Sequence, residues 1–103
     1  MNRSTLVELI AARFSHLGQS DAEFAVTTIL DAMTDAMVRG QRIEVRGFGN
    51  FTVVHRAPRL GRNPRSGEPV NIPQMRLPHF KPGKALREAV DQYGDELEVQ
   101  PTV

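Results

Sequence analysis

The feature that most limits the fold of this chain is the placement of proline, because six of its seven prolines lie between Pro58 and Pro82. Proline has no backbone N–H, so it breaks helices and is accepted in sheets only on edge strands. Both strands of a two-stranded ribbon are edges. The run Asn-Pro-Arg-Ser-Gly at residues 63–67 is a turn signal, and apolar residues alternate after it. We therefore predict a long β-hairpin arm over about residues 55–78.

The predicted arm is too long to be covered by the core of a 103-residue chain. Its first limb, residues 56–64, would extend about 30 Å at roughly 3.3 Å per residue. A free two-stranded ribbon is only marginally stable in water. We therefore expect the arm to protrude and to become ordered against a partner surface.

Apolar residues at helical spacing predict two helices before the arm. The first begins near Thr5, which forms a predicted capping box with Glu8. The second begins near Ser20, paired in the same way with Glu23, and ends before Gly40. Two such helices joined by a short turn form a helical hairpin, an arrangement also found in helix-turn-helix DNA readers.

After the second helix the period of the apolar residues changes to two, which predicts two strands joined by a tight turn at Gly47-Phe48-Gly49. A third helix is predicted from Lys84 to the residue before Gly94. The acidic segment 95–103 is predicted to be a flexible tail, so the folded domain covers residues 1–94. The predicted fold class is α+β, with a helical hairpin base, an antiparallel sheet that carries the protruding arm, and a short C-terminal helix.

Charge is distributed unevenly along the chain, whose formal net charge is only +1. Residues 55–87 hold eight Lys or Arg and one acid, Glu68, a balance of +7, so the rest of the chain carries −6. Segregation of this kind is typical of a protein that binds a polyanion. The alternative is a basic, solvated loop.

Several function classes lack the residues that they need. The chain has no cysteine, so it has neither disulfides nor a thiolate metal site, as is typical of a reducing compartment. Charged residues interrupt the apolar positions of the first 14 residues, which argues against a signal peptide or a membrane span. Gly47-x-Gly49 lacks the third glycine of a dinucleotide loop, and His16, His55 and His79 show no nucleophile–base spacing. We expect a cytoplasmic protein that is not an enzyme and needs no metal or cofactor.

Three motifs carry a resemblance to a known family. They are Gly47-Phe48-Gly49-Asn50-Phe51, then Arg56-x-x-Arg59-x-Gly61-Arg62-Asn63-Pro64-x-x-Gly67, and Phe80-Lys81-Pro82-Gly83-Lys84. From Asn2 to Gly94 the chain resembles the HU and integration host factor family of bacterial DNA-bending proteins. Glu44-Val45-Arg46 and Pro78-His79 resemble the beta-type chains of that family. The chain departs from the family pattern at Ser66, where threonine is usual, and in its longer tail.

The resemblance implies an architectural protein that binds the minor groove of duplex DNA and bends it sharply, with a preference for DNA shape. It implies association with the nucleoid and a part in recombination, replication, transcription and the regulation of translation. It also implies an intertwined dimer, formed with a related alpha-type subunit or with a second copy of the chain. Phe48, Phe51 and Phe80, together with the apolar helix stripes, would then form the core and the dimer interface.

Four arginines recur at every third residue of the predicted arm, namely Arg56, Arg59, Arg62 and Arg65. In a strand this spacing alternates faces, so the guanidinium groups would reach both walls of a DNA groove. Contacts with phosphates would make the affinity fall steeply with salt while reading little sequence. The alternative is that these arginines only deter edge-to-edge pairing of the ribbon.

Pro64, at the predicted tip of the arm, is a rigid apolar residue without an N–H donor. By themselves the residues favour an ordinary turn-forming proline. The resemblance implies instead a wedge that enters between base pairs and kinks the duplex.

Glu44 and Arg46 are two residues apart, so in a strand they share a face and the carboxylate can orient the guanidinium. The alternative is an exposed ion pair worth about 0–1 kcal/mol. The resemblance implies that Arg46 enters a narrow minor groove and senses its shape. Phosphate contacts are also predicted at the starts of the first and third helices, where the backbone carries partial positive charge. The complete set of predicted DNA-binding residues is Arg3, Ser4, Arg42, Glu44, Arg46, Arg56, Arg59, Arg62, Asn63, Pro64, Arg65, Arg76, His79, Lys81, Gly83 and Lys84.

Three alternative functions stay open. A non-specific HU-like nucleoid protein acting as a homodimer differs mainly in lacking a strong site, and Glu44 with Arg46 argues against it. An enzyme would require a histidine mutant that loses activity without losing DNA binding. A membrane or protein-docking role for the basic arm predicts binding to anionic vesicles at least as tight as binding to DNA.

Overall fold

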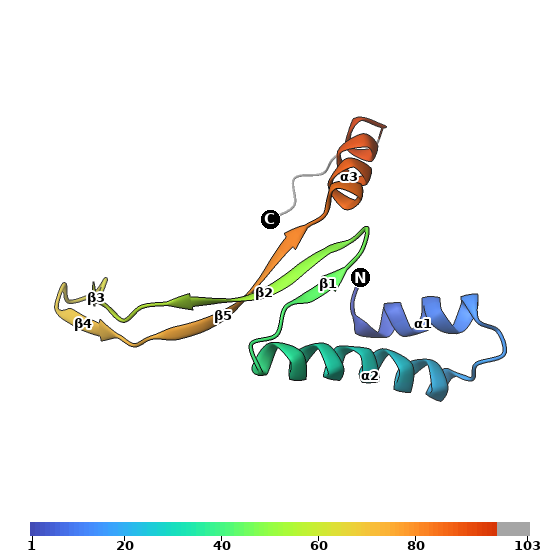
Figure 1. The fold of residues 1–103 in the computed structure, drawn as a ribbon, viewed down its shortest axis with the longest axis horizontal. Helices are drawn as coiled ribbons and strands as arrows, with labels where there is room; N and C mark the ends of the chain where they lie inside the picture. Colours follow the sequence, from blue (N-terminus) through green and yellow to red (C-terminus); the bar gives the residue numbers. More distant parts are fainter. Residues whose placement is uncertain (97–103) are drawn as a thin grey trace. The chain divides into compact units, whose positions relative to one another are not determined.

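The computed structural model describes residues 1–96, with side chains described as far as Gln92. The chain divides into two units, of which the first ends at Arg39 and the second begins at Gly40 (Figure 1). The first unit is helical, and the second holds every strand and the third helix. No helix in the described part of the chain is long and apolar enough to cross a membrane.

The first unit is the predicted helical hairpin, formed by α1 (Arg3–Arg13) and α2 (Gln19–Val38). The two helices pack through a small apolar core in which Val7, Ala22 and Val26 are buried. Leu6, Ile10 and Ala11 of α1 are partly buried against this core, whereas large apolar residues of α2, such as Phe24 and Ile29, stay exposed. The prediction of two helices joined by a short turn is confirmed.

The caps of both helices differ from the prediction. Asn2 is the N-cap of α1, where its Oδ1 accepts a hydrogen bond from the Thr5 backbone N–H at 2.9 Å. The capping box is therefore Asn2 with Thr5, not Thr5 with Glu8. In α2 the predicted Ser20 cap is wrong because Gly18 is the N-cap, in an extended conformation and without a side-chain cap. The helix begins one residue before Ser20, since the Gly18 carbonyl already accepts from the Ala22 N–H at 3.0 Å.

The second unit begins with a three-stranded antiparallel sheet in the order β1 (Ile43–Val45), β2 (Gly49–Arg56) and β5 (Met75–Pro82). The tight turn between β1 and β2 is confirmed, because Gly47 has a φ of 82° that favours glycine. On one side of the sheet, Phe51 and Phe80 are opposite each other across the β2–β5 ladder, with ring centroids 4.7 Å apart.

The arm continues from β2 and β5 into a second ribbon of β3 (Arg59–Arg62) and β4 (Pro69–Ile72), as Figure 1 shows. The predicted hairpin is confirmed, but it is not continuous. The β2–β5 ladder ends at the pair of Arg56 with Met75, and the β3–β4 ladder starts at the pair of Arg59 with Ile72. Ala57-Pro58 and Pro73-Gln74 separate the two ladders, and each of these segments contains a proline, which has no N–H to donate.

The third helix, α3 (Lys84–Glu96), is longer than predicted. The predicted end at Gly94 is wrong, because α3 passes through that glycine. Glycine within a helix costs about 1 kcal/mol relative to alanine, and it ends a helix only where it adopts a left-handed conformation. The first two residues of the predicted tail thus belong to α3, and residues 97–103 lie outside the described part of the chain.

Candidate nucleic-acid interface

The side of the β2–β5 ladder opposite the phenylalanines is polar. Residues that pair across an antiparallel ladder point to the same side, and alternate pairs share it. Asn50 pairs with Lys81, Thr52 with His79, and Arg56 with Met75, while one apolar pair, Val54 with Leu77, lies between the last two. We call Asn50, Thr52, Arg56, His79 and Lys81 the polar face. The fold thus brings residues from two distant segments of the sequence onto one surface.

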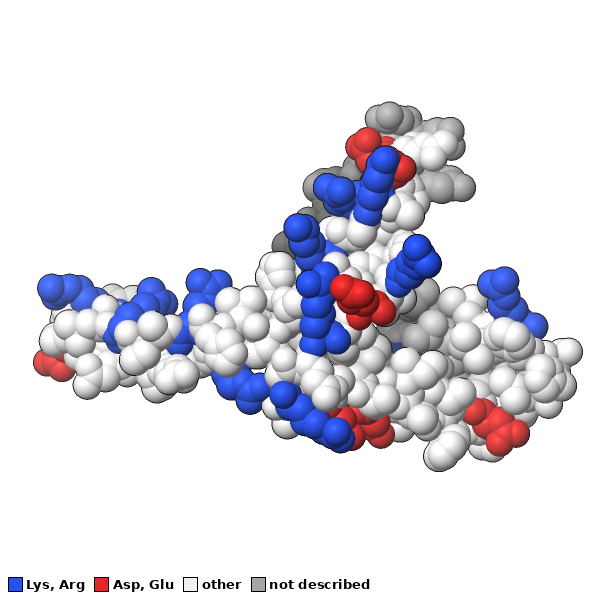
Figure 2. All heavy atoms as spheres, viewed as in Figure 1, with Lys and Arg blue, Asp and Glu red and all other residues white. Residues whose placement is uncertain are grey.

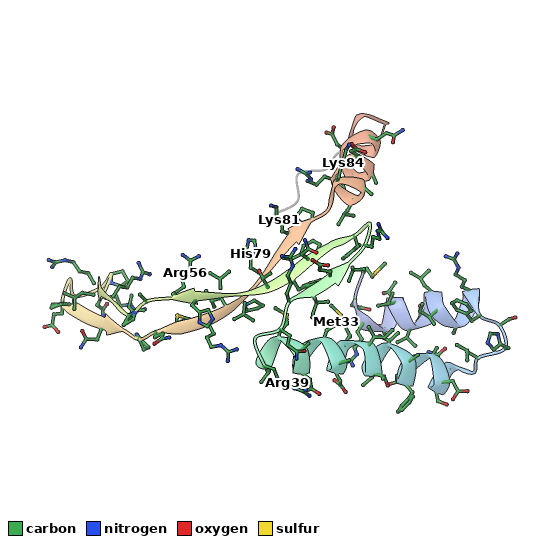
Figure 3. All side chains as sticks on the ribbon, viewed as in Figure 1. Met33, Arg39, Arg56, His79, Lys81 and Lys84 are labelled. Atoms are coloured by element: carbon green, nitrogen blue, oxygen red, sulfur yellow. The ribbon has the colours of Figure 1, made fainter. Side chains whose placement is uncertain are left out.

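A groove lies where the polar face meets the start of α3, and we call it the base groove. Figure 3 labels His79, Lys81 and Lys84, which follow one another along β5 and into α3. Four cationic side chains contribute to the groove, and no carboxylate is among its lining residues, which are Arg42, Asn50, Thr52, His79, Lys81, Pro82, Gly83, Lys84 and Arg87. A concave, cationic surface of this kind attracts an anionic partner.

Gly83 takes part in the base groove in a different way from that predicted. Its backbone N–H donates to the Phe48 carbonyl at 2.8 Å, so it is already used within the protein and does not face a phosphate. A Cβ atom at this position would lie 3.3 Å from the same carbonyl oxygen. Gly83 therefore allows the start of α3 to approach the turn before β2.

The predicted pairing of Glu44 with Arg46 is wrong. Glu44 Oε1 lies 3.1 Å from Arg42 Nη2 instead, in an exposed ion pair. Asn50, which pairs with Glu44 across the β1–β2 ladder, accepts from the same Arg42 nitrogen at 3.1 Å when its amide oxygen faces that group. Arg46 follows the last residue of β1 and enters the glycine turn, where the two-residue alternation of a strand no longer applies.

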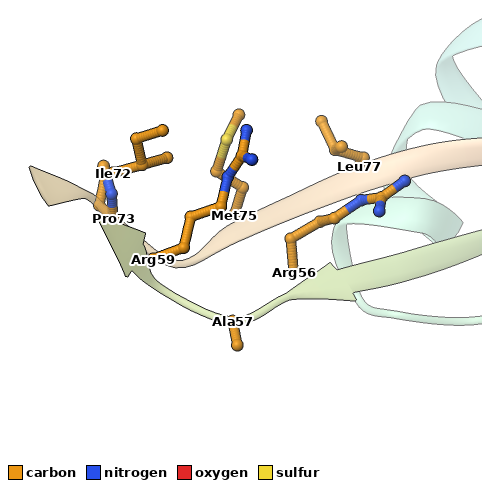
Figure 4. Close-up of a pocket in the computed structure, with 7 residues that line it drawn as sticks. All are labelled: Arg56, Ala57, Arg59, Ile72, Pro73, Met75 and Leu77. Carbon is orange, nitrogen blue, oxygen red and sulfur yellow. The ribbon is translucent and has the colours of Figure 1, made fainter. Parts of the chain in front are cut away.

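On the arm, Arg56 and Arg59 lie on the same side rather than on alternate faces. Both side chains line a notch, the arm notch, with Ala57, Ile72, Pro73, Met75 and Leu77. In Figure 4 the two guanidinium groups project to the same side of the ribbon as Ile72, Met75 and Leu77. In an unbroken strand, side chains three residues apart point to opposite faces. The break at Ala57-Pro58 interrupts this alternation, so the side chains of Arg56 and Arg59 point to the same face.

At the tip of the arm, the side chains of the turn mainly hold the turn itself. The Asn63 side chain accepts from the Arg65 backbone N–H at 2.9 Å, and Arg62 Nη1 donates to the Gly67 carbonyl at 3.1 Å. Gly67 has a φ of 71°, which favours glycine. Pro64 lies in this turn and is exposed, as a residue that contacts a partner must be.

One predicted residue of β5, Arg76, is not on the polar face, and two others, Arg3 and Ser4, belong to the first unit. Arg76 pairs with His55 on the opposite side of the ladder, and a Cβ atom on Gly40 would lie 3.8 Å from its Nη2. In the first unit, Arg3 Nη2 donates to Thr27 Oγ1 at 3.0 Å, and the Ser4 hydroxyl donates to Asn2 Oδ1 at 2.7 Å. Both residues are thus engaged within the helical hairpin.

Figure 2 shows Lys and Arg side chains along the arm and over the sheet of the second unit, with few acidic side chains among them. Where side chains are described, no group of three or more His, Asp or Glu residues could hold a metal ion. The electrostatic character of the site is therefore that of an extended cationic surface.

A profile of the family described as "Bacterial DNA-binding protein" matches residues 1–91. The chain belongs to this family.

Relatives within the bacterial DNA-binding protein family include integration host factor subunit beta from two organisms. The protein of Herminiimonas arsenicoxydans is 57% identical over 91 residues, which cover 88% of this chain and 90% of that protein. The protein of Dechloromonas aromatica is 58% identical over 92 residues, which cover 89% of this chain and 98% of that protein. The resemblance stated from the sequence motifs is confirmed.

Solved structures of the same family support the fold. A cocrystal structure of Anabaena HU with DNA has a TM-score of 0.80 at 36% identity, covering 87% of this chain and 97% of that chain. HU from Thermotoga maritima has a TM-score of 0.60 at 30% identity, covering 87% of this chain and 98% of that chain. The predicted α+β architecture is confirmed.

Three residues of this cationic surface were not among those predicted for this member of the bacterial DNA-binding protein family. Arg87 lines the base groove, and its spacing of three from Lys84 places both on one helix face. Asn50 and Thr52 share the polar face with Arg56, which the two-residue period of β2 could have indicated.

Proposed function

We propose that this chain is an architectural protein that binds the minor groove of duplex DNA and bends it sharply. The observation that carries the proposal is a pair of cationic surfaces on one side of β2 and β5, which the apolar pair of Val54 with Leu77 separates. The first is the base groove, with Arg42, Lys81 and Lys84, and the second is the arm notch, with Arg56 and Arg59. Surfaces so placed contact a sugar–phosphate backbone and hold it chiefly by charge.

The arm provides the means of bending. Pro64 stands exposed in a turn that is closed by hydrogen bonds of Asn63 with Arg65, Gly67 and Glu68. Its insertion between base pairs unstacks them, at a few kcal/mol per step, and kinks the duplex. Arg62 and Arg65 beside it bind the flanking phosphates.

Sequence preference arises from DNA shape. Arg46 stands in the turn after β1 without an ion-pair partner among the described residues, so its guanidinium is available to a narrow minor groove. Arg42, which lines the base groove, is a further cation on β1's side of this unit, and its ion pair with Glu44 leaves both side chains exposed.

The chain acts as a dimer, either with a related alpha-type subunit or with a second copy of itself. The first unit supports this proposal, because large apolar side chains on α2 remain exposed: Phe24 to 72%, Ile29 to 60% and Val38 to 65%. Burial of such side chains between chains stabilises an assembly. We place this dimer at the nucleoid in the cytoplasm, with residues 1–94 as its DNA-binding domain and no catalytic role.

The proposal is tested by resonance energy transfer across an end-labelled duplex of about three helical turns, at matched saturation. The wild-type chain, alone or with an alpha-type partner, brings the duplex ends together. Pro64→Ala does so much less, whereas Pro69→Ala, which removes an arm proline outside the tip, bends as the wild type does. A duplex that stays straight when saturated would show that the chain is not a bending protein.

A non-specific HU-like homodimer is the second candidate. The match to HU structures at 36% and 30% identity favours it on fold alone. A competition series separates the two, because a shape-reading protein prefers particular duplexes among equal lengths at fixed salt, and an HU-like protein does not.

A further inference from the structure

We propose that Met75 is a site of reversible oxidation, at which peroxides weaken the contact of the arm with DNA. The inference rests on the proposed function, because it assigns a consequence to a residue of the DNA-binding arm. It concerns a residue that plays no part in the charge pattern of the site.

Met75 occupies a particular place in the arm. It is the first residue of β5, it pairs with Arg56, and the residue is 44% exposed, so a small oxidant can approach it from solvent. Its side chain lines the arm notch together with Arg56 and Arg59 and projects to the same side of the ribbon (Figure 4). The thioether therefore lies on the surface that faces DNA in the proposed complex.

The other methionines lie in the first unit, which does not contain the arm. They are Met1, Met33 and Met37, of which Met33 and Met37 are partly buried on α2. Met75, in contrast, lies in a strand and lines the arm notch. Oxidation of Met75, but not of the other methionines, would therefore change the chemistry of the notch.

The chemical step is an oxygen transfer from a hydroperoxide. The sulfur attacks one peroxide oxygen and forms an S–O bond while the O–O bond breaks. With hydrogen peroxide the departing group is hydroxide, which takes the proton of the new S–OH group, so the products are methionine sulfoxide and water. The sulfur is oxidised by two electrons and the peroxide is reduced by two, and methionine sulfoxide reductases reverse the change.

Oxidation changes the arm notch in two ways. The sulfoxide oxygen carries partial negative charge, so it repels a phosphate that approaches Arg56 and Arg59. The sulfoxide oxygen is also a strong hydrogen-bond acceptor, so it competes with phosphate for the N–H donors of the Arg59 guanidinium. The apolar floor formed by Ile72 and Leu77 gains a polar, hydrated neighbour, which weakens its packing against a deoxyribose.

The test measures DNA affinity of the full-length wild-type dimer before and after hydrogen peroxide, with peptide mass spectrometry to follow oxidation at each methionine. We expect the oxidised protein to lose affinity about five- to tenfold, equal to part of one charge-assisted hydrogen bond. Treatment with methionine sulfoxide reductases restores it. Met75→Leu has no sulfur to oxidise at this position, so its affinity after peroxide treatment equals its own affinity before treatment, whatever that value is.

Two further variants make the result specific. Met75→Gln places a polar acceptor at the same position and lowers affinity without any oxidant. The double variant Met33→Leu, Met37→Leu keeps Met75, so peroxide still lowers the affinity of this variant for DNA. Equal losses in wild type and Met75→Leu, or full affinity when Met75 is oxidised, would overturn the inference. Failure of the untreated wild type to bind DNA would instead contradict the proposed function.

Discussion

Gly49 lies so close to Phe80 that a Cβ atom at position 49 would come within 2.6 Å of the ring carbon Cε1. The same Cβ atom would lie 2.6 Å from the backbone carbonyl oxygen of Lys81. Gly49 is buried and pairs with Pro82 at the point where β2 begins. The absence of a side chain here allows the aromatic cluster to pack directly against the β2 backbone.

Gly49→Ala is expected to destabilise the protein by about 1–3 kcal/mol, because a backbone carbonyl cannot move aside as a side chain can. The matched variant is Gly61→Ala on the arm, where the new Cβ atom would meet Ile72 Cδ1 at 2.6 Å. That atom ends a flexible side chain, so we expect a loss of less than about 1 kcal/mol. Urea unfolding followed by circular dichroism at fixed protein concentration measures both. Equal losses of unfolding free energy in the two variants would show that the backbone contact at Gly49 costs no more than the side-chain contact at Gly61.

The cap of α1 predicts a second pair of variants. Asn2→Ala removes the side chain that accepts from the Thr5 N–H, so we expect a loss of about 1 kcal/mol. Ser20→Ala removes a side chain that caps nothing, because Gly18 is the N-cap of α2, and its effect should stay within about 0.5 kcal/mol. Thermal unfolding of the two variants distinguishes the observed caps from those predicted by the sequence pattern. A larger loss of stability in Ser20→Ala would indicate that Ser20 caps α2, as the sequence pattern predicted.

The exposed pair of Arg42 with Glu44 contributes to binding more than to stability. Its side chains are 57% and 67% exposed, so Glu44→Gln should change the free energy of unfolding by less than about 1 kcal/mol. Loss of the carboxylate beside the base groove should strengthen binding to a random duplex about two- to fivefold, because it removes a repulsion with phosphate. Titration at fixed salt measures this change. Unchanged or weaker binding would show that Glu44 orients Arg42 rather than opposing DNA.

The salt dependence of binding distinguishes the two sides of the β2–β5 ladder. Arg56→Ala should lower the slope of log affinity against log salt by about 0.9 for each copy of the chain in the complex. Arg76→Ala removes the same charge from the opposite side of the sheet, and its slope should change by less than half as much. Titrations at four or more salt concentrations give both slopes. Equal changes would mean that DNA contacts both sides.

Much of the fold follows from local features of the sequence. The helical period before Gly40, the two-residue period after it and the prolines of the arm act over a few residues, so they predict helices, strands and ribbon without knowledge of their partners. The positive φ values at Gly47 and Gly67 agree with the predicted turns. The helix boundaries at Ser20 and Gly94 were wrong, because neighbouring residues provided alternative starts and ends.

The arrangement of the site depended on contacts between distant segments. The sequence by itself determined which side chains carry charge, that the arm is a proline-rich hairpin, and which family the motifs resemble. Only the tertiary structure decided that Glu44 pairs with Arg42, that Arg56 and Arg59 share a side, and that the Gly83 N–H is used by Phe48. The physical reason is that strand register and a break in a ladder set the direction of every later side chain, and both are decided by the partner strand.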